Sequence, residues 1–230
     1  HGTGAQFGGL ATQVAGVTLI TAAGEFLRID ENENTELLPA VALGLGALGI
    51  IVEVTLRCVP AFVMRAIDEP APLEDVLATL HDRVAASDHF EFYWFPHTEV
   101  ALTKRQSREP ESTRREPLPA WGRWVDETLL SNGVYRAVCA AGRVAPAITP
   151  PFNRLAVRLT GDRQYTDRSH RVLTQSRTVR FREMEYALPA ENVVPAFRAI
   201  RSLIAKRRWR IEFPIEVRFA EEDDRWLSTA

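Results

Sequence analysis

The chain has 230 residues, of which 46% are hydrophobic and 25% charged, as expected of a globular protein with one large domain or two small ones. Its formal net charge of -2 gives no general attraction to nucleic acid or to anionic lipid, which argues against proteins that bind by bulk charge. The most apolar run, residues 37–52, is interrupted by a proline and three glycines and is shorter than the ~20 residues of a membrane-spanning helix.

The sequence contains no local motif typical of a metal site, a redox centre or a hydrolase. The two cysteines, Cys58 and Cys139, form no CxxC or Cys/His spacing, so we expect free, buried thiols in a reducing compartment and no metal site. Four histidines lack metal-ligand spacing and are interpreted as surface or capping residues: His81, His89, His97 and His170. Because GxSxG, P-loop and HExxH motifs are absent, hydrolases, kinases and zinc proteases are disfavoured.

The N-terminal residues 1–12 are rich in glycine. Such a loop lets backbone N–H groups approach a phosphate or a ring closely, although a plain flexible lead-in has the same composition. Two runs with alternating apolar residues, 14–21 and 25–29, follow on either side of an Ala-Gly turn and predict a β-hairpin. A short helix is expected over about 35–45, after a polar turn.

The stretch 44–49 reads Gly-Leu-Gly-Ala-Leu-Gly and therefore has the letters of the GxGxxG dinucleotide motif. In a nicotinamide-binding fold this motif must follow a strand and begin a helix, so that the helix N-terminus meets the pyrophosphate. Here the order is reversed, because the residues before the motif favour a helix and residues 50–56 favour a strand. We therefore interpret the glycines as a helix-to-strand turn instead of a Rossmann site.

Pro60 is the predicted domain boundary, because the pattern beyond it changes to alternating strands and helices. The elements expected there are a strand at 62–67, a helix at 72–86, a strand at 89–95 with a partner at 100–106, a charged loop at 107–119, helices at 121–144 and 153–159, a strand at 178–187, a helix at 191–207 and a strand at 210–219. Two strand–helix–strand units on either side of a helical insertion predict an α+β domain with one sheet backed by helices.

The last predicted strand places two charged side chains together. Because side chains alternate along a strand, Glu216 and Arg218 share one face, whereas the apolar residues of 213–219 share the other. A carboxylate and a guanidinium at this spacing can hold a polyol hydroxyl and an anionic centre together. A surface ion pair has the same spacing and is more common, so spacing alone favours that structural role.

Several short segments together resemble one enzyme family. They are the opening His-Gly-Thr-Gly-Ala, the segment 45–56, and the segments 89–92, 184–189 and 213–218. As a set they resemble the aldonolactone oxidoreductase branch of the vanillyl-alcohol-oxidase-type FAD flavoproteins. That branch contains L-gulono-1,4-lactone and D-arabinono-1,4-lactone oxidases and dehydrogenases. The resemblance extends over essentially the whole chain and is weakest in 107–175.

The resemblance implies an α+β fold made of two parts. Residues 1–59 would be the C-terminal part of a PCMH-type FAD-binding domain, and residues 60–230 a cap domain with a mainly antiparallel sheet backed by helices. The cap would be incomplete at its C-terminus and carry a helical insertion at about 116–160. The cofactor implied is FAD, which takes a hydride at N5 from a sugar lactone or polyol and is reoxidised by oxygen or another electron acceptor. A bacterial cytoplasmic protein, or one peripheral to the membrane, is implied, with no nucleic-acid partner and no integral membrane segment.

The resemblance also assigns roles to individual residues. Those expected to bind FAD are His1, Gly2, Thr3 and Gly4 of the opening loop and Gly49, Ile50 and Ile51 of the glycine-to-strand turn. Glu216 and Arg218 are expected to be catalytic. The arginine would stabilise negative charge on the reduced flavin and on the substrate oxygen, and the glutamate would hold or deprotonate the substrate hydroxyl.

Two parts of the family pattern are missing from the sequence. These are the N-terminal flavin-binding subdomain, with the histidine that often links covalently to FAD, and the C-terminal segment with its histidine- and lysine-containing motif. We therefore expect the chain to be an internal piece that binds FAD poorly and turns over nothing by itself. Two alternatives remain open: an alditol oxidase of the same superfamily, and a non-catalytic α+β binding module with a structural Glu–Arg pair.

Overall fold

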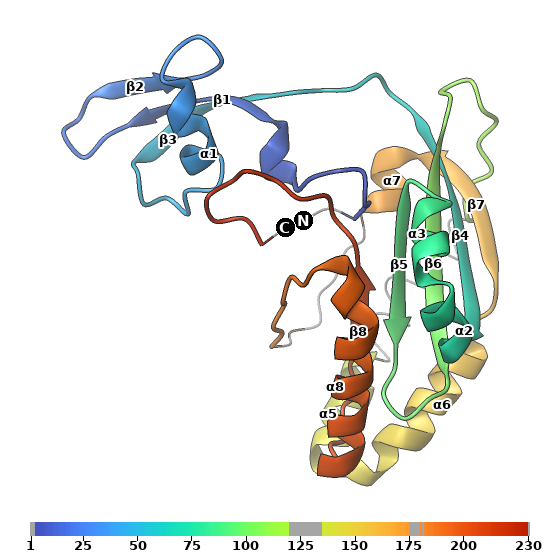
Figure 1. Ribbon diagram of the computed structural model, residues 1–230. Helices are drawn as coiled ribbons and strands as arrows, with labels where there is room; N and C mark the ends of the chain where they lie inside the picture. The colour runs from blue at the N-terminus through green and yellow to red at the C-terminus, as the bar shows by residue number, and fades with distance from the viewer. Residues whose placement is uncertain (1–2, 120–134, 175–179, 181, 230) are drawn as a thin grey trace. The chain divides into compact units, whose positions relative to one another are not determined.

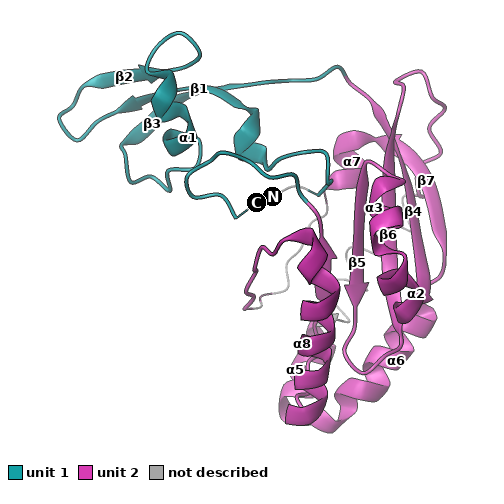
Figure 2. Ribbon diagram, in the orientation of Figure 1, with its two compact units in different colours: residues 1–60, 220–230 teal, residues 61–219 magenta. Residues whose placement is uncertain are grey.

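The computed structural model describes residues 3–119, 135–174, 180 and 182–229, and the chain divides into two compact units (Figures 1 and 2). Unit 1 comprises His1–Pro60 and Ala220–Ala230, and unit 2 comprises Ala61–Phe219. The first boundary thus falls at Pro60. The segment 220–230 differs from the sequence-based division, which placed it in the second domain. It lies in unit 1 because its backbone bonds there: the Glu221 N–H donates to the Phe7 carbonyl at 3.1 Å.

Unit 1 is built on a three-stranded antiparallel sheet in the order β2-β1-β3. Its elements are η1 (Leu10–Gln13), β1 (Val14–Ile20), β2 (Phe26–Ile29), η2 (Thr35–Leu37), α1 (Leu38–Val41) and β3 (Ile50–Leu56). The predicted hairpin is confirmed by the pairing of β1 with β2. The helix predicted over 35–45 is shorter, because α1 ends at Val41. Leu45 and Gly46 take positive φ angles of 51° and 76°, which a right-handed helix does not contain.

The core of unit 1 lies between this sheet and α1. Val17, Leu19 and Ile29 are buried on the sheet side, and Leu38 and Val41 cover them from the helix side. Val17 and Leu19 stand two residues apart on β1, so the period of two seen in the sequence points them to the same face. β3 follows the turn at 44–49, so helix, glycines and strand occur in the predicted order and the Rossmann interpretation is excluded.

Gly49 is required by the backbone of unit 1. Its φ of 151° is disfavoured for other residues, and a Cβ placed there would lie 2.4 Å from the Ile20 carbonyl oxygen. We expect Gly49→Ala to lower the free energy of unfolding by about 2–3 kcal/mol, measured by urea denaturation. The matched control is Gly46→Ala, whose φ is 76° but whose added Cβ meets nothing within 4 Å. It should cost only about 1 kcal/mol, and equal losses in the two variants would contradict the steric argument.

Unit 2 is built on a five-stranded sheet in the order β7-β4-β6-β5-β8, in which every neighbouring pair is antiparallel. The strands are β4 (Val63–Pro72), β5 (His89–Trp94), β6 (Val100–Glu109), β7 (Arg163–Arg168) and β8 (Ile215–Arg218). The expected α+β class with a mainly antiparallel sheet and helices is confirmed.

The helices of unit 2 come both from between the strands and from the insertion. They are α2 (Leu73–Ala78), α3 (Leu80–Ala85), α5 (Tyr135–Val144), η4 (Pro146–Ile148), α6 (Thr149–Leu159), α7 (Ser169–Leu173), η5 (Ala190–Asn192) and α8 (Val193–Arg207). The single helix predicted over 72–86 is divided at Thr79, whose hydroxyl donates to the Asp75 carbonyl at 2.7 Å. Of the insertion expected at about 116–160, the described residues 116–119 are not helical, whereas α5, η4 and α6 occupy most of 135–159.

Several predicted elements of unit 2 differ from the structure. Residues 107–109 extend β6 instead of starting a loop, because they pair with the first residues of β4. β7 was not predicted, since its sequence Arg-Gln-Tyr-Thr-Asp-Arg has little apolar alternation. No strand occurs in the described residues 182–187 of the expected strand 178–187, and β8 covers only part of 210–219. Residues 121–134 of the expected helix 121–144 lie outside the described part.

The main core lies between one face of the large sheet and α2, α3 and α8 (Figure 1). Phe90, Phe92 and Trp94 of β5 all point to this face and are at most 2% exposed. The Phe197 ring of α8 packs edge-on against Phe92 and Trp94, with centroid distances of 5.6 and 5.3 Å. We call this side of the sheet the helix-covered face. Because side chains alternate along a strand, the charged residues between these apolar ones point to the other side of the sheet.

Candidate functional site

The second side of the large sheet, which we call the polar face, carries a group of charged side chains from three adjacent strands. Val217 of β8 is paired with the core residue Phe92, so its neighbours Glu216 and Arg218 project from the opposite side. The partners of these two residues on β5 are Tyr93 and Glu91, respectively. Lys104 of β6 is in turn paired with Glu91. The sheet register therefore brings these five residues together.

Of the two cations in this group, Arg218 is the more shielded from solvent. Its guanidinium lies 3.7 Å from a Glu216 carboxylate oxygen and 2.5 Å from one of Glu185. The Arg218 side chain is 15% exposed, against 30% for Glu216 and 59% for Glu185. A surface ion pair, the role that spacing alone favours, would leave the guanidinium open to water, so this arginine is unusually well shielded.

Glu91 contacts both Tyr93 and Lys104. The Tyr93 hydroxyl donates a hydrogen bond to Glu91 Oε1 at 3.0 Å, and Lys104 Nζ lies 3.7 Å from the same oxygen. The ammonium also lies over the Tyr93 ring, 4.9 Å from its centroid. Glu91 is 13% exposed and Lys104 is 28% exposed, so both can still be reached from solvent.

The charges of this group nearly balance. Three carboxylates, from Glu91, Glu185 and Glu216, accompany the two cations Arg218 and Lys104. The arrangement offers hydrogen-bond donors and acceptors side by side, which is what a ligand with several hydroxyl groups needs. A fixed guanidinium can also stabilise an oxygen that gains negative charge during a reaction.

Of the four opening-loop residues expected to bind the cofactor, the structure describes only Thr3 and Gly4. His1 and Gly2 lie outside the described residues, and Thr3 has no regular secondary structure. Gly4 is buried, has a φ of 125° and forms a parallel bridge with Ala220 of the C-terminal segment. The described part of the expected cofactor loop is therefore held in place by 220–230.

The glycine-to-strand turn lies at the beginning of β3. Ile50 and Ile51 pair with Ile20 and Leu19 of β1, and their side chains are 70% and 48% exposed. The expected cofactor residues therefore lie in unit 1, and Glu216 and Arg218 lie in unit 2.

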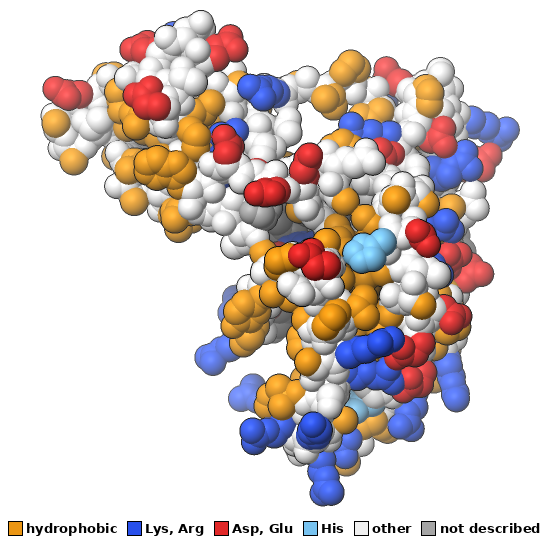
Figure 3. All heavy atoms as spheres, in the orientation of Figure 1, with side chains coloured by type: hydrophobic (Ala, Val, Ile, Leu, Met, Phe, Trp, Pro, Cys, Tyr) orange, Lys and Arg blue, Asp and Glu red, His pale blue; other side chains and the backbone are white. Residues whose placement is uncertain are grey.

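The strand β3 and the turn before it leave apolar side chains exposed. They are Leu45, Leu48, Ile50, Ile51, Val52, Val54 and Leu56. Figure 3 shows hydrophobic side chains gathered over this sheet. Beside them, no atom lies within 4 Å of where a Gly46 Cβ would be, so the turn backbone is accessible. The described residues of unit 1 thus fit part of a flavin-nucleotide site.

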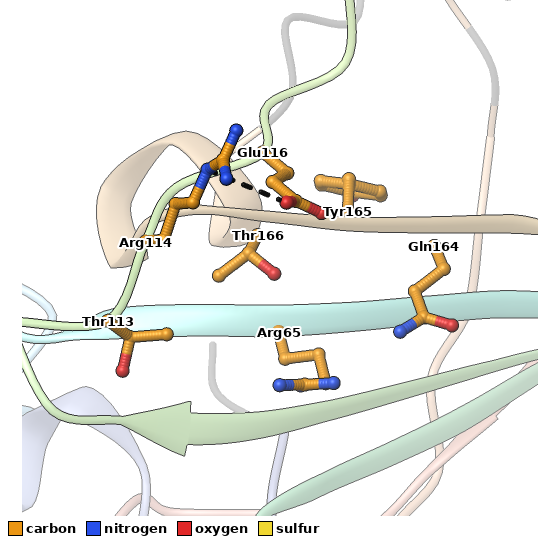
Figure 4. Close-up of a pocket in the computed structure, with 7 residues that line it drawn as sticks. All are labelled: Arg65, Thr113, Arg114, Glu116, Gln164, Tyr165 and Thr166. Atoms are coloured by element: carbon orange, nitrogen blue, oxygen red, sulfur yellow. Dashed lines mark ion pairs between the residues drawn. The ribbon is translucent and has the colours of Figure 1, made fainter.

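A pocket at the opposite edge of the large sheet is a weaker candidate. It has a volume of about 360 Å³ and is lined by Arg65, Thr113, Arg114, Glu116, Gln164, Tyr165 and Thr166 (Figure 4). Its arginines are already paired, Arg65 with Glu109 at 3.0 Å and Arg114 with Glu116 at 3.8 Å. β7 and β8 are the two edge strands, so this pocket lies on the order of 19 Å from Arg218 at the usual strand spacing.

Outside this group and the pocket, the histidines and cysteines that the structure describes do not form a second centre. Among the residues that the structure describes, no three His, Cys, Asp or Glu side chains gather to hold a metal. Both cysteines are free, but Cys58 is exposed instead of buried as expected, because it follows the exposed strand β3. Burial, and then the nearby Glu212, raises the pKa of the Cys139 thiol. His89 is 8% exposed within β5, so its interpretation as a surface residue is wrong.

His97 is the histidine whose ionisation the fold affects. It occupies the turn between β5 and β6, and burial together with Arg210 and Arg154 lowers its pKa. The side chain therefore favours the neutral form near pH 7, and no contact between described residues links it to the group around Arg218. In the described part of the chain, no helix is both long and apolar enough to cross a membrane.

Comparison with known proteins identifies the family of this chain. The model of the family described as "ALO: D-arabinono-1,4-lactone oxidase" matches residues 54–230, which include all of unit 2. The chain belongs to the D-arabinono-1,4-lactone oxidase family. The resemblance stated from the sequence is thereby confirmed.

Individual relatives of the family extend the match over the remaining residues. L-gulono-1,4-lactone dehydrogenase of Mycobacterium tuberculosis is 40% identical over all of this chain, which covers 52% of that protein. L-gulonolactone oxidase of Scyliorhinus torazame is 31% identical over 99% of the chain, which covers 51% of it. The chain therefore spans about half the length of these lactone oxidoreductases.

Among solved structures, a variant of cholesterol oxidase from Brevibacterium sterolicum has the same fold. It superposes with a TM-score of 0.66 over 95% of this chain and 46% of that one, at 17% sequence identity. At this identity the likeness concerns the fold alone. It supports the α+β architecture.

Sequence reasoning proposed Glu216 and Arg218 as site residues but did not single out the residues that surround them. Glu91 and Tyr93 could have been found, because they alternate with the aromatic core residues of 89–95 and so share a face. Lys104 follows the same rule on the partner strand. Glu185 had no such signal, because it lies in an irregular segment and reaches Arg218 through tertiary structure alone.

Proposed function

We propose that the protein is an FAD-dependent oxidoreductase that oxidises a CH–OH group of a sugar 1,4-lactone of the gulono- or arabinono-type. The observation that carries this proposal is the shielded Arg218, held against Glu216 and Glu185 on the polar face. Membership of a family described by lactone oxidation supports the choice of substrate class. The two free cysteines accord with a reducing compartment, so we place the protein in the cytoplasm.

The residues of the polar face suit such a reaction. The Glu216 carboxylate can accept the hydrogen of the substrate hydroxyl and orient its carbon, because the pairing of β8 with β5 fixes the strand that bears it. The Arg218 guanidinium can stabilise negative charge on the substrate oxygen as the C–H bond breaks. Their proximity lets one hydroxyl group contact both side chains.

The cofactor part of the proposal rests on unit 1. The residues that would hold FAD are His1–Gly4 in the opening loop and Gly49, Ile50 and Ile51 at the start of β3. A bound FAD supplies the two-electron acceptor for the hydrogen that leaves the carbinol carbon. The accessible glycine turn and the apolar side chains beside it support this assignment.

The mixed donors and acceptors of the polar face would also suit an open-chain polyol, so an alditol is the second candidate substrate. A non-catalytic binding module is the alternative from another class. These three functions predict different rates of flavin reduction when a substrate is added in the absence of oxygen.

The test uses the protein expressed from its complete gene and purified with its flavin. We expect the visible flavin absorbance to bleach faster with L-gulono-1,4-lactone than with xylitol at equal concentration. Faster bleaching by xylitol would replace the lactone with an alditol as substrate. A flavin-loaded protein that neither compound reduces would overturn the proposal.

A further inference from the structure

We propose that Glu91, Tyr93 and Lys104 form a subsite that binds the hydroxyl-bearing side chain of the substrate and so contributes to specificity. This inference rests on the proposed function. It assigns a role to three residues of the polar face that the Glu216–Arg218 chemistry does not use. The argument depends on the positions of the three residues, on the unused hydrogen-bonding capacity of Glu91 and Lys104, and on the charge around them.

The positions follow from the register of three strands. Tyr93 is directly opposite Glu216, and Glu91 is directly opposite Arg218. Side chains on one face of such a pair have Cβ atoms about 4.5–5.5 Å apart. Lys104 is the next residue across the sheet, opposite Glu91. A ligand that contacts Glu216 and Arg218 is therefore within reach of all three.

Part of the hydrogen-bonding capacity of Glu91 and Lys104 is unused within the described part of the chain. The Tyr93 hydroxyl and Lys104 Nζ both approach the same oxygen, Glu91 Oε1, which leaves Oε2 able to accept from a ligand. The 3.7 Å separation from Lys104 Nζ is too long for a hydrogen bond, so the ammonium keeps donors for a ligand or water. Vicinal hydroxyl groups need donors and acceptors side by side in this way.

The charge around the subsite indicates a neutral ligand. Glu91, Glu185 and Glu216 together outnumber the cations Arg218 and Lys104, so a phosphate or carboxylate would meet net repulsion. An apolar group would displace water from Lys104 Nζ and Glu91 Oε2 without supplying hydrogen bonds in its place. The side chain of a sugar lactone is uncharged and carries hydroxyl groups, and it meets both conditions.

Two conservative substitutions remove the proposed contacts one at a time. Tyr93→Phe removes only the hydroxyl and keeps the ring beneath Lys104, and Lys104→Met keeps most of the side-chain length without its charge. Matched controls are Tyr165→Phe on β7, the opposite edge strand, and Lys206→Met on the exposed side of α8. Thermal unfolding midpoints verify that all four variants fold.

The measurement is the KM for L-gulono-1,4-lactone and the rate of flavin reduction at saturating lactone, in the protein expressed from its complete gene. We expect the KM to rise about tenfold in Tyr93→Phe and Lys104→Met, with the saturated reduction rate within about twofold of wild type. The controls should behave as wild type. With 2-hydroxy-γ-butyrolactone, which lacks the side chain, the two variants should bind as wild type does.

An unchanged KM in both variants, while wild type oxidises the lactone, would overturn the subsite and leave the proposed function intact. If wild type oxidises neither lactone nor polyol, the proposed function fails, and titration calorimetry with L-gulono-1,4-lactone then decides on the subsite. Binding by wild type that weakens in Tyr93→Phe but not in Tyr165→Phe supports it. Equal binding, or none in wild type, refutes it.

Discussion

Arg218→Met should lower lactone oxidation by about 10²–10³-fold, because it removes the guanidinium that can stabilise the substrate oxygen as negative charge develops. The loss should occur mainly in the rate of flavin reduction at saturating lactone and not in the KM, since this interaction strengthens in the transition state. Rapid mixing of the flavin-loaded protein with L-gulono-1,4-lactone in the absence of oxygen measures that rate directly.

Two further variants make this result specific. Arg105→Met removes another paired arginine of the same sheet, held 3.2 Å from Glu69 on the helix-covered face, and should leave the rate unchanged. Arg218→Lys keeps the positive charge near Glu216 and Glu185 but loses the planar fork, so an intermediate rate is expected. If Arg218→Met oxidised the lactone at the wild-type rate, the Glu216–Arg218 pair would be structural and its catalytic assignment wrong.

Phe197→Ala should lower the free energy of unfolding by about 3–5 kcal/mol. The Phe197 side chain is 3% exposed and packs edge-on against two aromatic rings of β5. Its removal would leave a cavity where α8 joins the sheet, and the rigid β5 ladder cannot close around it. Urea denaturation followed by far-UV circular dichroism measures the change.

Leu203→Ala is the matched control for this prediction, because it removes a large apolar side chain from the same helix at a position that is 41% exposed. It should cost less than about 1 kcal/mol. Similar losses in the two variants would show that α8 is stabilised by its own helical structure more than by the aromatic contact.

The local periodicity of the sequence predicted much of this fold. The alternation in 89–95 and 213–219 predicted β5 and β8 and the face of each residue, and the apolar spacing of 191–207 predicted α8. The pairing of β5 with β8 could not be read in the same way, because the two strands are far apart in the sequence and register is decided by tertiary packing. The whole group around Arg218 depends on that pairing.

Elements with weak local patterns were missed for a related reason. β7 is composed of polar and charged residues, and it is a strand because β4 supplies its hydrogen-bond partners. Glu185 reaches Arg218 from a segment without regular structure, so no period in the sequence could indicate the contact. The return of 220–230 to unit 1 likewise follows from long-range backbone bonds to Phe7 and Pro39.

The exposed strand β3 has a consequence for how this polypeptide behaves in solution. All seven residues of Ile50–Leu56 are exposed, only Glu53 among them is charged, and β3 is an edge strand of its sheet. Such an edge offers unpaired N–H and C=O groups flanked by β-branched side chains, which is the usual template for strand addition between molecules. The 230-residue chain should therefore aggregate with rising concentration wherever no other surface covers this edge.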